Sequence, residues 1–228
     1  TLEEDAARRD LTVNALYYDA GKFEVFEHVH GLADLNRRSI RVIGDPAVRF
    51  REDPVRMLRV LRFAAKLDFS IEQQTARAIP GCARLLAEIP AARLFDEFLK
   101  LFLSGHAAAT MEQLLKHDLL QYLFPESNDC LHRDEHALAL VRAAMANTDQ
   151  RIAQDKPVTP AFLLPALLWP VAQREARHLQ NRGDPPMVAM HSAAQSTISE
   201  AARHISIPRR FSQPMREIWE FQLRLQRQ

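Results

Sequence analysis

A group of cations between positions 49 and 66 is the first feature of this sequence that could do chemistry. Six cationic side chains stand here against two acids, Glu52 and Asp53. Five of the six are arginines, whose guanidinium can donate paired hydrogen bonds to a phosphate or to the edge of a base. The alternative is a solvated helix face without a chemical role. The cations are Arg49, Arg51, Arg56, Arg59, Arg62 and Lys66.

Asp10 is a second candidate, because a two-metal displacement needs carboxylates that hold divalent ions. Alternate side chains of a strand share one face, so Asp10, Thr12 and Asn14 would point the same way. Asp10 also follows Arg8 and Arg9 directly, and could instead be an ion-pair partner at the entrance of a strand. The spacing alone favours neither role.

His132 to His136 spells H-x-x-E-H, a zinc-binding pattern, with Glu200 as a conceivable third ligand. Two histidines four residues apart share one face of a helix. The segment is polar, follows a loop, and is short enough to arise by chance in a chain with 9 histidines. We therefore favour a solvated helix start over a zinc site.

The elements that position these residues are predicted to be mainly helical, because glycine is scarce and good helix formers are plentiful. The start of the chain is different. We expect there a hairpin of strands 11–18 and 23–29, a turn-like helix at 32–35, and a short strand at 40–43. A loop is expected at 125–130. Helices are predicted over 54–67, 71–87, 91–104, 106–122, 133–154, 160–182, 187–205 and 212–227.

The predicted helix 54–67 carries most of the cations. Asp53 is a good N-cap and Pro54 suits the first helical position. Apolar residues from Met57 to Leu67 recur at helical spacing, so they should form one buried face. The arginines then lie on the opposite side of a helix with an apolar back.

Residues 8–16 (RRDLTVNAL) resemble the RRD-x-T-x-N-A-L strand of the class II nucleotidyltransferases, which comprise tRNA CCA-adding enzymes and bacterial poly(A) polymerases. Residues 51–67 resemble the E-D-x-x-R helix of that family, and 31–43 fit the segment between the two motifs. The later segments 93–101, 119–125 and 147–169 resemble the poly(A) polymerases in particular. The resemblance therefore covers nearly the whole chain.

This resemblance implies a mainly α protein with a helical neck and body and a small N-terminal β remnant of a head domain. Residues 1–45 would be the last part of the catalytic head. Residues 46–125 would be a neck that binds nucleotide and RNA, and 126–228 a body that binds RNA. The implied reaction is addition of AMP from ATP to RNA 3′ ends with Mg²⁺, and RNA-decay proteins are further expected partners.

The resemblance also implies residue roles. Asp10 would be catalytic, as a ligand of the metal pair, and Arg9 and Asn14 would contact the ribose and phosphates. Asp53 and Arg56 would read the base, and Arg59 would contact the triphosphate. Apart from the resemblance, the concentration of positive charge over 49–66 predicts that the remaining cations contact RNA or phosphate: Arg49, Arg51, Arg62 and Lys66.

One part of the family pattern does not occur in these residues. The family holds its metal pair on a D-x-D strand after a Gly-Ser turn, and this sequence contains neither motif. We therefore expect the chain alone to be inactive. It opens at Thr1 and enters motif-like sequence at once, which suggests an interior piece of a longer protein. A CCA-adding enzyme and a non-catalytic helical RNA-binding module remain the alternatives.

Composition and net charge indicate the cellular compartment of the protein but do not identify its binding partner. The net charge is +1, so it predicts no polyanion by itself. Cys82 and Cys130 are far apart, which favours a reducing compartment, and we expect a cytoplasmic protein. The longest apolar run, 162–171, is interrupted by prolines and is too short to cross a bilayer. The sequence does not predict an oligomeric state.

Overall fold

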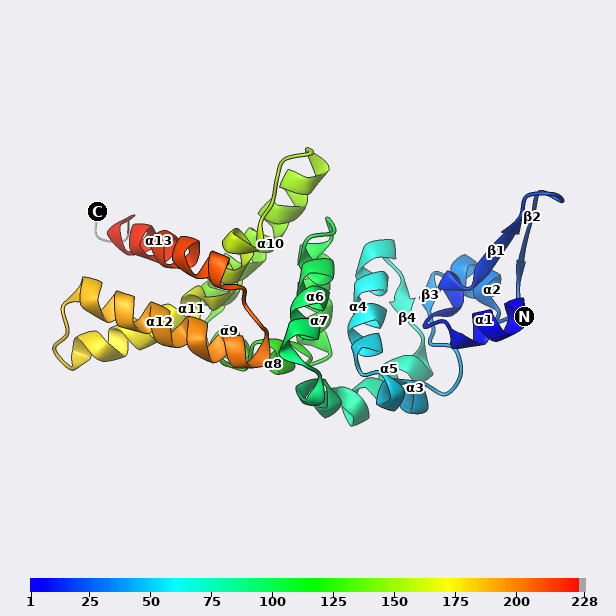
Figure 1. Cartoon of the computed structure of the whole chain (residues 1–228), viewed down its shortest axis with the longest axis horizontal. Helices are drawn as coiled ribbons and strands as arrows, with labels where there is room; N and C mark the ends of the chain where they lie inside the picture. The colour runs from blue at the N-terminus through cyan, green and yellow to red at the C-terminus, as the bar shows by residue number, and fades with distance from the viewer. Residues whose placement is uncertain (226–228) are drawn as a thin grey trace. The chain divides into compact units, whose positions relative to one another are not determined.

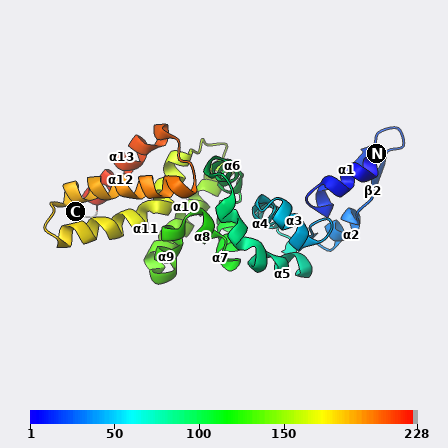
Figure 2. The same ribbon diagram turned by 60° about the horizontal axis from the view of Figure 1, so that its bottom comes forward.

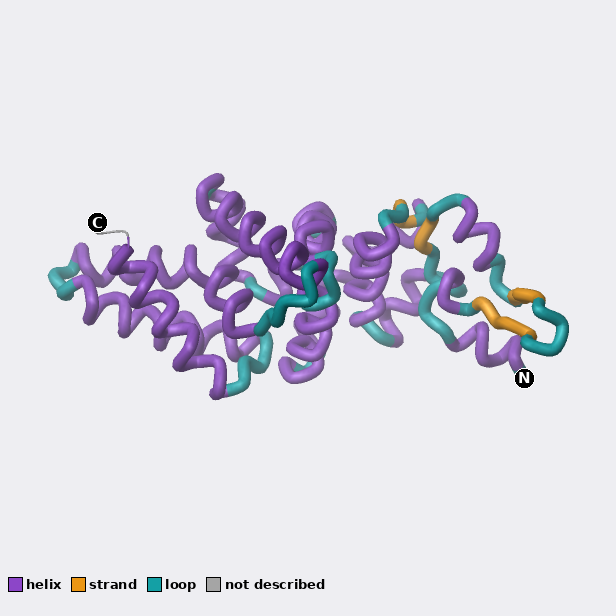
Figure 3. Tube along the Cα trace, turned by 90° about the horizontal axis from the view of Figure 1, so that it is seen from above, coloured by secondary structure: helices purple, strands orange, loops and turns teal. Residues whose placement is uncertain are grey.

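The computed structural model describes residues 1–225 and divides the chain into two compact units (Figure 1). The first unit comprises Thr1–Ile89 and Glu112–Leu119, and the second comprises Pro90–Met111 and the chain from Leu120 onward. Helices dominate, which confirms the mainly α prediction, and the strands of the described residues are confined to the N-terminal third (Figure 3). The division into head, neck and body stays a prediction.

The elements before Pro90 alternate short strands with short helices. They are α1 (Leu2–Arg8), the 3₁₀ turn η1 (Thr12–Asn14), β1 (Leu16–Asp19), β2 (Glu24–Glu27), α2 (Gly31–Asn36), β3 (Ser39–Ile40), α3 (Pro46–Glu52), α4 (Val55–Leu67), β4 (Ser70–Ile71), α5 (Gln73–Cys82) and the 3₁₀ segment η2 (Ala83–Glu88).

The predicted hairpin is present, since β1 pairs antiparallel with β2. Its first strand is shorter than predicted, because residues 12–14 form a 3₁₀ turn. The Thr12 hydroxyl donates to the buried Asp34 carboxylate at 2.8 Å, a contact between residues 22 positions apart. The prediction that Asp10, Thr12 and Asn14 share a strand face is therefore wrong.

The strand predicted at 40–43 is also shorter, and it has a partner that the sequence did not indicate. β3 pairs in parallel with β4, with Ile40 opposite Ile71. Val42 continues the segment by forming an isolated antiparallel bridge with Leu11. Both residues of that bridge are buried. This bridge fixes the backbone next to Asp10.

Two consecutive helices carry the cations of segment 49–66. α3, which the sequence did not predict as a separate helix, begins at Pro46 after Asp45, whose carboxylate accepts from the Val48 amide at 2.9 Å. α4 buries the predicted apolar face almost completely, although Leu67 is only half-buried. It ends at Asp68, which adopts a left-handed conformation (φ 52°). The helix thus presents its arginines from a rigid support.

From Ala91 onward the described residues are all helices and connections. The helices are α6 (Ala91–Phe102), α7 (Ala107–Lys116), α8 (Leu120–Leu123), α9 (Pro125–Arg133), α10 (Glu135–Ala153), α11 (Pro160–Asn181), α12 (Pro186–His204) and α13 (Arg209–Leu225). The predicted helix 106–122 is two helices. The loop predicted at 125–130 is wrong, because Pro125 occupies the first turn of α9.

Long-range polar contacts tie the second unit together. α11 and α12 lie side by side (Figure 2), and α13 packs on α11, where the Trp219 indole donates to the Pro165 carbonyl at 3.0 Å. The Asp149 carboxylate on α10 accepts from the amides of Ala107 and Ala108 at 2.6 and 2.9 Å, so it caps α7 from 42 residues away. No helix among residues 1–225 is long and apolar enough to span a membrane.

Candidate functional site

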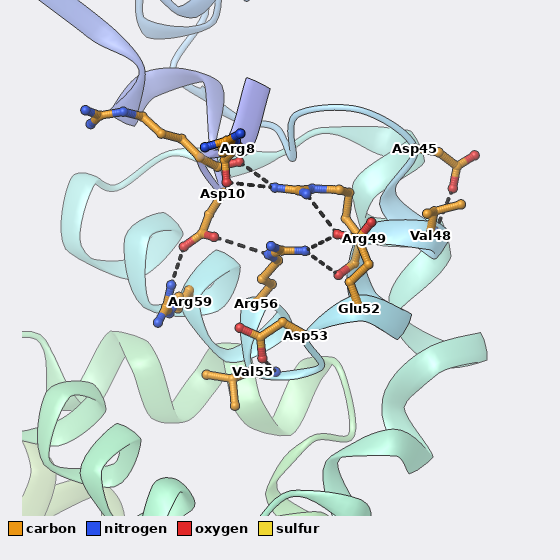
Figure 4. Close-up of polar contacts among 11 residues, drawn as sticks. Arg8, Asp10, Asp45, Val48, Arg49, Glu52, Asp53, Val55, Arg56 and Arg59 are labelled. Carbon is orange, nitrogen blue, oxygen red and sulfur yellow. Dashed lines mark hydrogen bonds and ion pairs between the residues drawn. The ribbon is translucent and has the colours of Figure 1, made fainter. Parts of the chain in front are cut away.

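Asp10 is the centre of a polar cluster in the first unit (Figure 4). Its carboxylate accepts from Arg56 Nε at 3.2 Å and from Arg59 Nη1 at 2.5 Å. The Asp10 side chain is 21% exposed and that of Arg56 is 13% exposed, so these are sheltered ion pairs. A pairing of Asp10 with Arg8 or Arg9 is therefore wrong. Both of its oxygens instead meet α4, 46 and 49 residues further along the chain.

Arg56 joins Asp10 to α3. Its Nη1 donates at 2.8 Å both to the Glu52 carboxylate and to the Arg49 carbonyl. The hydrogen bond from Arg56, helped by the Arg49 charge, lowers the pKa of Glu52. These contacts use Nε and Nη1, so Nη2 keeps its donors for another group. Because Asp10, Glu52 and the Arg49 carbonyl all contact it, the Arg56 guanidinium is held in place without a substrate.

Arg49 fastens the segment before Asp10 to the same cluster. Its Nη1 donates to Glu52 at 2.8 Å, while its Nη2 donates to the carbonyls of Arg8 and Arg9 at 3.1 and 2.8 Å (Figure 4). Arg49 was predicted from its charge as an RNA or phosphate contact. In this geometry it braces the backbone that carries Asp10. We refer to Asp10, Arg49, Glu52, Arg56 and Arg59 as the arginine cluster.

Arg9 and Asn14 lie beside the arginine cluster and line one cavity of about 410 Å³ with Asp10 and Phe63. Arg9 Nη1 donates to the Asn14 carbonyl at 2.9 Å, its Nε donates to Asp5 at 3.0 Å, and its guanidinium lies 5.2 Å from the centre of the Tyr17 ring. The cavity therefore has one apolar wall and three polar ones, which suits a ring that carries polar edges.

Phe63 is the residue of this cavity that the sequence reasoning missed. It was counted with neither the buried face of α4 nor its cations, and it is half-buried at the boundary between them. The Arg62 guanidinium lies 4.7 Å from its ring centre. Its position four residues after Arg59, on the side of the helix that carries the arginines, was the available signal.

The other predicted site residues surround this centre without joining it. Asp53 accepts from the Val55 amide at 3.3 Å, but the N-cap of α4 is Pro54, which makes no side-chain cap hydrogen bond, so the predicted N-cap position of Asp53 is off by one residue. Arg51 and Lys66 are exposed. The structure therefore unites Asp10, Arg56 and Arg59, adds Arg9 and Asn14 around the cavity, and turns Arg49 to a bracing contact.

The metal assignment to Asp10 can be tested against the chemistry of its neighbours. Mg²⁺ requires several oxygen ligands in octahedral geometry. Arginines approach both Asp10 oxygens, and no group of three potential metal-ligating side chains occurs in the described part of the chain. The residues present do not form a magnesium site by themselves.

The zinc alternative is also contradicted by the fold. His132 lies in the last turn of α9 and His136 in the first turn of α10, so one helix does not carry both. Asp134 separates them and caps α10 by accepting from the His136 amide at 2.8 Å. The preferred alternative, a solvated helix start, agrees with this arrangement.

Comparison with known proteins finds relatives that align with the whole length of the chain. The family described as "Poly A polymerase head domain" matches residues 1–41, "Probable RNA and SrmB- binding site of polymerase A" matches 68–131, and "Polymerase A arginine-rich C-terminus" matches 182–228. The chain is 42% identical to poly(A) polymerase I of Salmonella typhi over 230 aligned residues, which cover 100% of the chain. It belongs to the poly(A) polymerase family. The chain spans half of the length of that relative.

The family shares its fold with the CCA-adding enzymes. A CCA-adding enzyme of Streptococcus thermophilus is 46% identical over 123 residues, which are 54% of the chain and 30% of that enzyme. A solved structure described as a tRNA nucleotidyltransferase complexed with a primer tRNA and an incoming ATP analog covers 97% of the chain and 58% of its own, with a TM-score of 0.61 at 23% identity. That structural likeness shows the fold alone.

Proposed function

We propose that this chain is part of a polynucleotide adenylyltransferase, which transfers AMP from ATP to RNA 3′ ends in the cytoplasm. The observation that carries the proposal is the arginine cluster beside a cavity of about 410 Å³, in a chain that aligns end to end with poly(A) polymerase I. RNA-decay proteins are proposed as further partners. The head, neck and body boundaries at 45 and 125 belong to the same proposal.

The arginine cluster supports a role in holding a triphosphate and a base. Arg9, which lines the cavity, and Arg59, which pairs with Asp10, offer guanidinium groups for phosphate oxygens, with Asn14 beside the ribose. Arg56 Nη2 and the Asp53 carboxylate supply a donor and an acceptor for the Watson–Crick edge of adenine. Phe63 supplies the apolar wall on which a base can stack. Exposed Arg51 and Lys66 and half-buried Arg62 are proposed to contact RNA phosphates.

Asp10 has two proposed roles that differ in their consequences. As a metal ligand it would act with carboxylates that these 228 residues do not supply. As an anchor it would fix the positions of Arg56 and Arg59, which it contacts on both of its oxygens. The second role needs no other segment, because every partner lies in the first unit.

A specific observation favours keeping the CCA-adding enzyme as the second candidate, namely the 46% identity over 123 residues. The full-length enzyme should be assayed with an RNA primer and either ATP or CTP. We expect long A-tails with ATP and little use of CTP. Addition of two C residues and one A to tRNA ends would assign the chain to the CCA-adding enzymes instead.

The 228-residue chain alone gives a further test. Because it contains no D-x-D motif, we expect no primer extension with ATP and Mg²⁺. We expect it to retain RNA binding, which a gel-shift assay measures. Extension by the pure chain would show that the metal site lies within it, and failure to bind RNA would contradict the proposed RNA contacts.

A further inference from the structure

The second unit contains a basic cleft. It has a volume of about 360 Å³ and lies where α9, the start of α10, and α11 meet. Its floor contains Pro170 and the buried thiol of Cys130, whose pKa is raised by burial. Its rim is polar, with three arginines against one acid: Arg133, Asp134, Gln173, Arg174, Arg177, His178 and Asn181.

Some of the arginines on this rim have ion-pair partners, and one does not. Arg174 pairs with Asp129 at 3.2 Å and with Glu126 at 3.6 Å, and Arg133 pairs with Asp129 at 2.8 Å. Arg177 is exposed and has no ion-pair partner among residues 1–225. The one acid on the rim, Asp134, already accepts from two amides at the start of α10. The cleft therefore keeps cationic charge available for a ligand.

The hydrogen-bond donors of α11, two of which are arginines, are arranged along a line. Arg174, Arg177, His178 and Asn181 recur at three- and four-residue spacing on α11, so they share one helix face. At a rise of 1.5 Å per residue, the line from Arg174 to Asn181 is about 10 Å long. The ion pairs of Arg133 and Arg174 are exposed, and such pairs contribute little free energy. Phosphates can therefore replace the carboxylates of α9 at small cost.

We propose that this α9–α11 cleft binds backbone phosphates of the single-stranded RNA substrate. This inference rests on the proposed function for the identity of the polyanion, and on charge complementarity for the site. A linear row of hydrogen-bond donors that includes two arginines fits a chain of regularly spaced phosphates better than it fits one compact anion. The rim has no phenylalanine, tyrosine or tryptophan for stacking, so we expect recognition here to depend little on sequence.

The experiment measures RNA affinity of the 228-residue chain by fluorescence anisotropy at several salt concentrations, with oligoadenylates and oligouridylates of increasing length. Arg177→Gln is the test variant, because Arg177 has no ion-pair partner among the described residues whose loss would affect folding. Arg203→Gln is the matched control: it removes the same charge from an exposed arginine in the same unit, which pairs with Glu200 at 2.8 Å.

We expect Arg177→Gln to weaken binding about two- to fivefold at low salt, as for an exposed ion pair. The slope of log affinity against log salt should become shallower by about 0.7, the value for one phosphate contact with a single strand. Both oligonucleotide types should show the same loss. Arg177→Glu should have the larger effect because it reverses the charge, and Arg203→Gln should change neither quantity.

Three results would overturn the inference. Unchanged affinity and slope for Arg177→Gln would remove the cleft from the RNA path. Equal losses for Arg177→Gln and Arg203→Gln would indicate diffuse attraction without a site. Competition by polyglutamate as strong as that by RNA would assign the cleft to an acidic protein segment. None of these depends on nucleotide transfer, so the proposed adenylyltransferase activity would stand or fall separately.

Discussion

The arginine cluster of the first unit and the α9–α11 cleft of the second use the same side chain in opposite ways. In the cluster, protein groups hold Arg49, Arg56 and Arg59 in place before any ligand arrives. In the cleft, Arg177 is exposed and held by no ion pair among the described residues. A fixed arginine loses little conformational entropy on binding and selects geometry, whereas a free one attracts charge without selecting shape. We therefore expect the cluster to act in nucleotide selection and the cleft to act in holding the RNA strand.

Asp10→Ala in the full-length enzyme is the strongest test of the arginine cluster. We expect kcat/KM to fall by about a hundred- to a thousandfold, because a metal ligand or the anchor of two arginines is lost. The free energy of unfolding should also fall by about 1–3 kcal/mol, because two sheltered arginines lose their charge partner. Steady-state kinetics and thermal unfolding measure the two effects.

Asp10→Asn distinguishes the two roles of Asp10. If Asp10 is a metal ligand, Asp10→Asn should shift the Mg²⁺ dependence of the rate. If Asp10 anchors Arg56 and Arg59, Asp10→Asn should change nucleotide selection without shifting the Mg²⁺ dependence. Asp68→Ala is the control, since its carboxylate is 97% exposed and pairs only loosely with Arg38 at 3.4 Å. An Asp10→Ala enzyme that kept more than a tenth of the rate would leave Asp10 as a structural ion pair.

Arg56→Ala should have the second largest effect. Loss of one charge-assisted contact is worth about 1.5–3 kcal/mol, or about ten- to a hundredfold in kcat/KM for ATP. The ratio of ATP to CTP use should fall as well, because Arg56 is proposed to read the base. Arg62→Ala is the matched comparison on the same helix and should weaken RNA binding without changing that ratio. The reverse pattern would place base selection elsewhere.

Phe63→Ala tests the apolar wall of the cavity. Stacking of a base on an aromatic ring is worth about 1–3 kcal/mol, so we expect KM for ATP to rise about tenfold. Phe63→Tyr and Phe63→Trp should retain most of the affinity because they keep the aromatic face. If Phe63→Leu binds ATP as well as the wild type, Phe63 fills space and does not stack.

The smallest expected effect is the loss of stability at low pH as Glu52 becomes protonated. Hydrogen bonds from Arg56 lower its pKa in the folded state, so its contribution to stability is present above the unfolded pKa of about 4.3 and is lost as the pH falls through the folded value. Glu52→Gln should lower Tm slightly at pH 7, and the difference from wild type should vanish well below pH 4. A difference that persisted there would not come from the charge. No such acid-sensitive loss is expected for Arg177→Gln.

Sequence patterns predicted the helices that carry their own signals. Asp53 and Pro54 placed the start of α4 within one residue, and the apolar spacing predicted its buried face. The predicted strand 11–18 was wrong at its start because its turn depends on the Thr12–Asp34 hydrogen bond. β-Branched residues favour strands locally, and a contact 22 residues away overrides that preference. α9 was not predicted as a helix from its start, because its polar sequence indicates a loop.

The candidate site was predictable in its members but not in its connections. Charge and motif resemblance indicated Asp10, Arg56 and Arg59, and their pairing spans 46 and 49 residues. No local pattern contains such a contact, so the bracing role of Arg49 and the position of Phe63 needed the fold. The sequence does not predict the cleft for the same reason, since its rim comes from two segments about 40 residues apart.

The buried indole of Trp219 gives the molecule an internal reporter. Trp169 and Trp219 are the 2 tryptophans of the chain, both are almost fully buried, and both belong to the second unit. Tryptophan emission therefore follows the melting of that unit alone, whereas circular dichroism follows helices in both. If the two signals change at different denaturant concentrations, the arginine cluster and the cleft belong to parts of the protein that unfold as separate cooperative blocks.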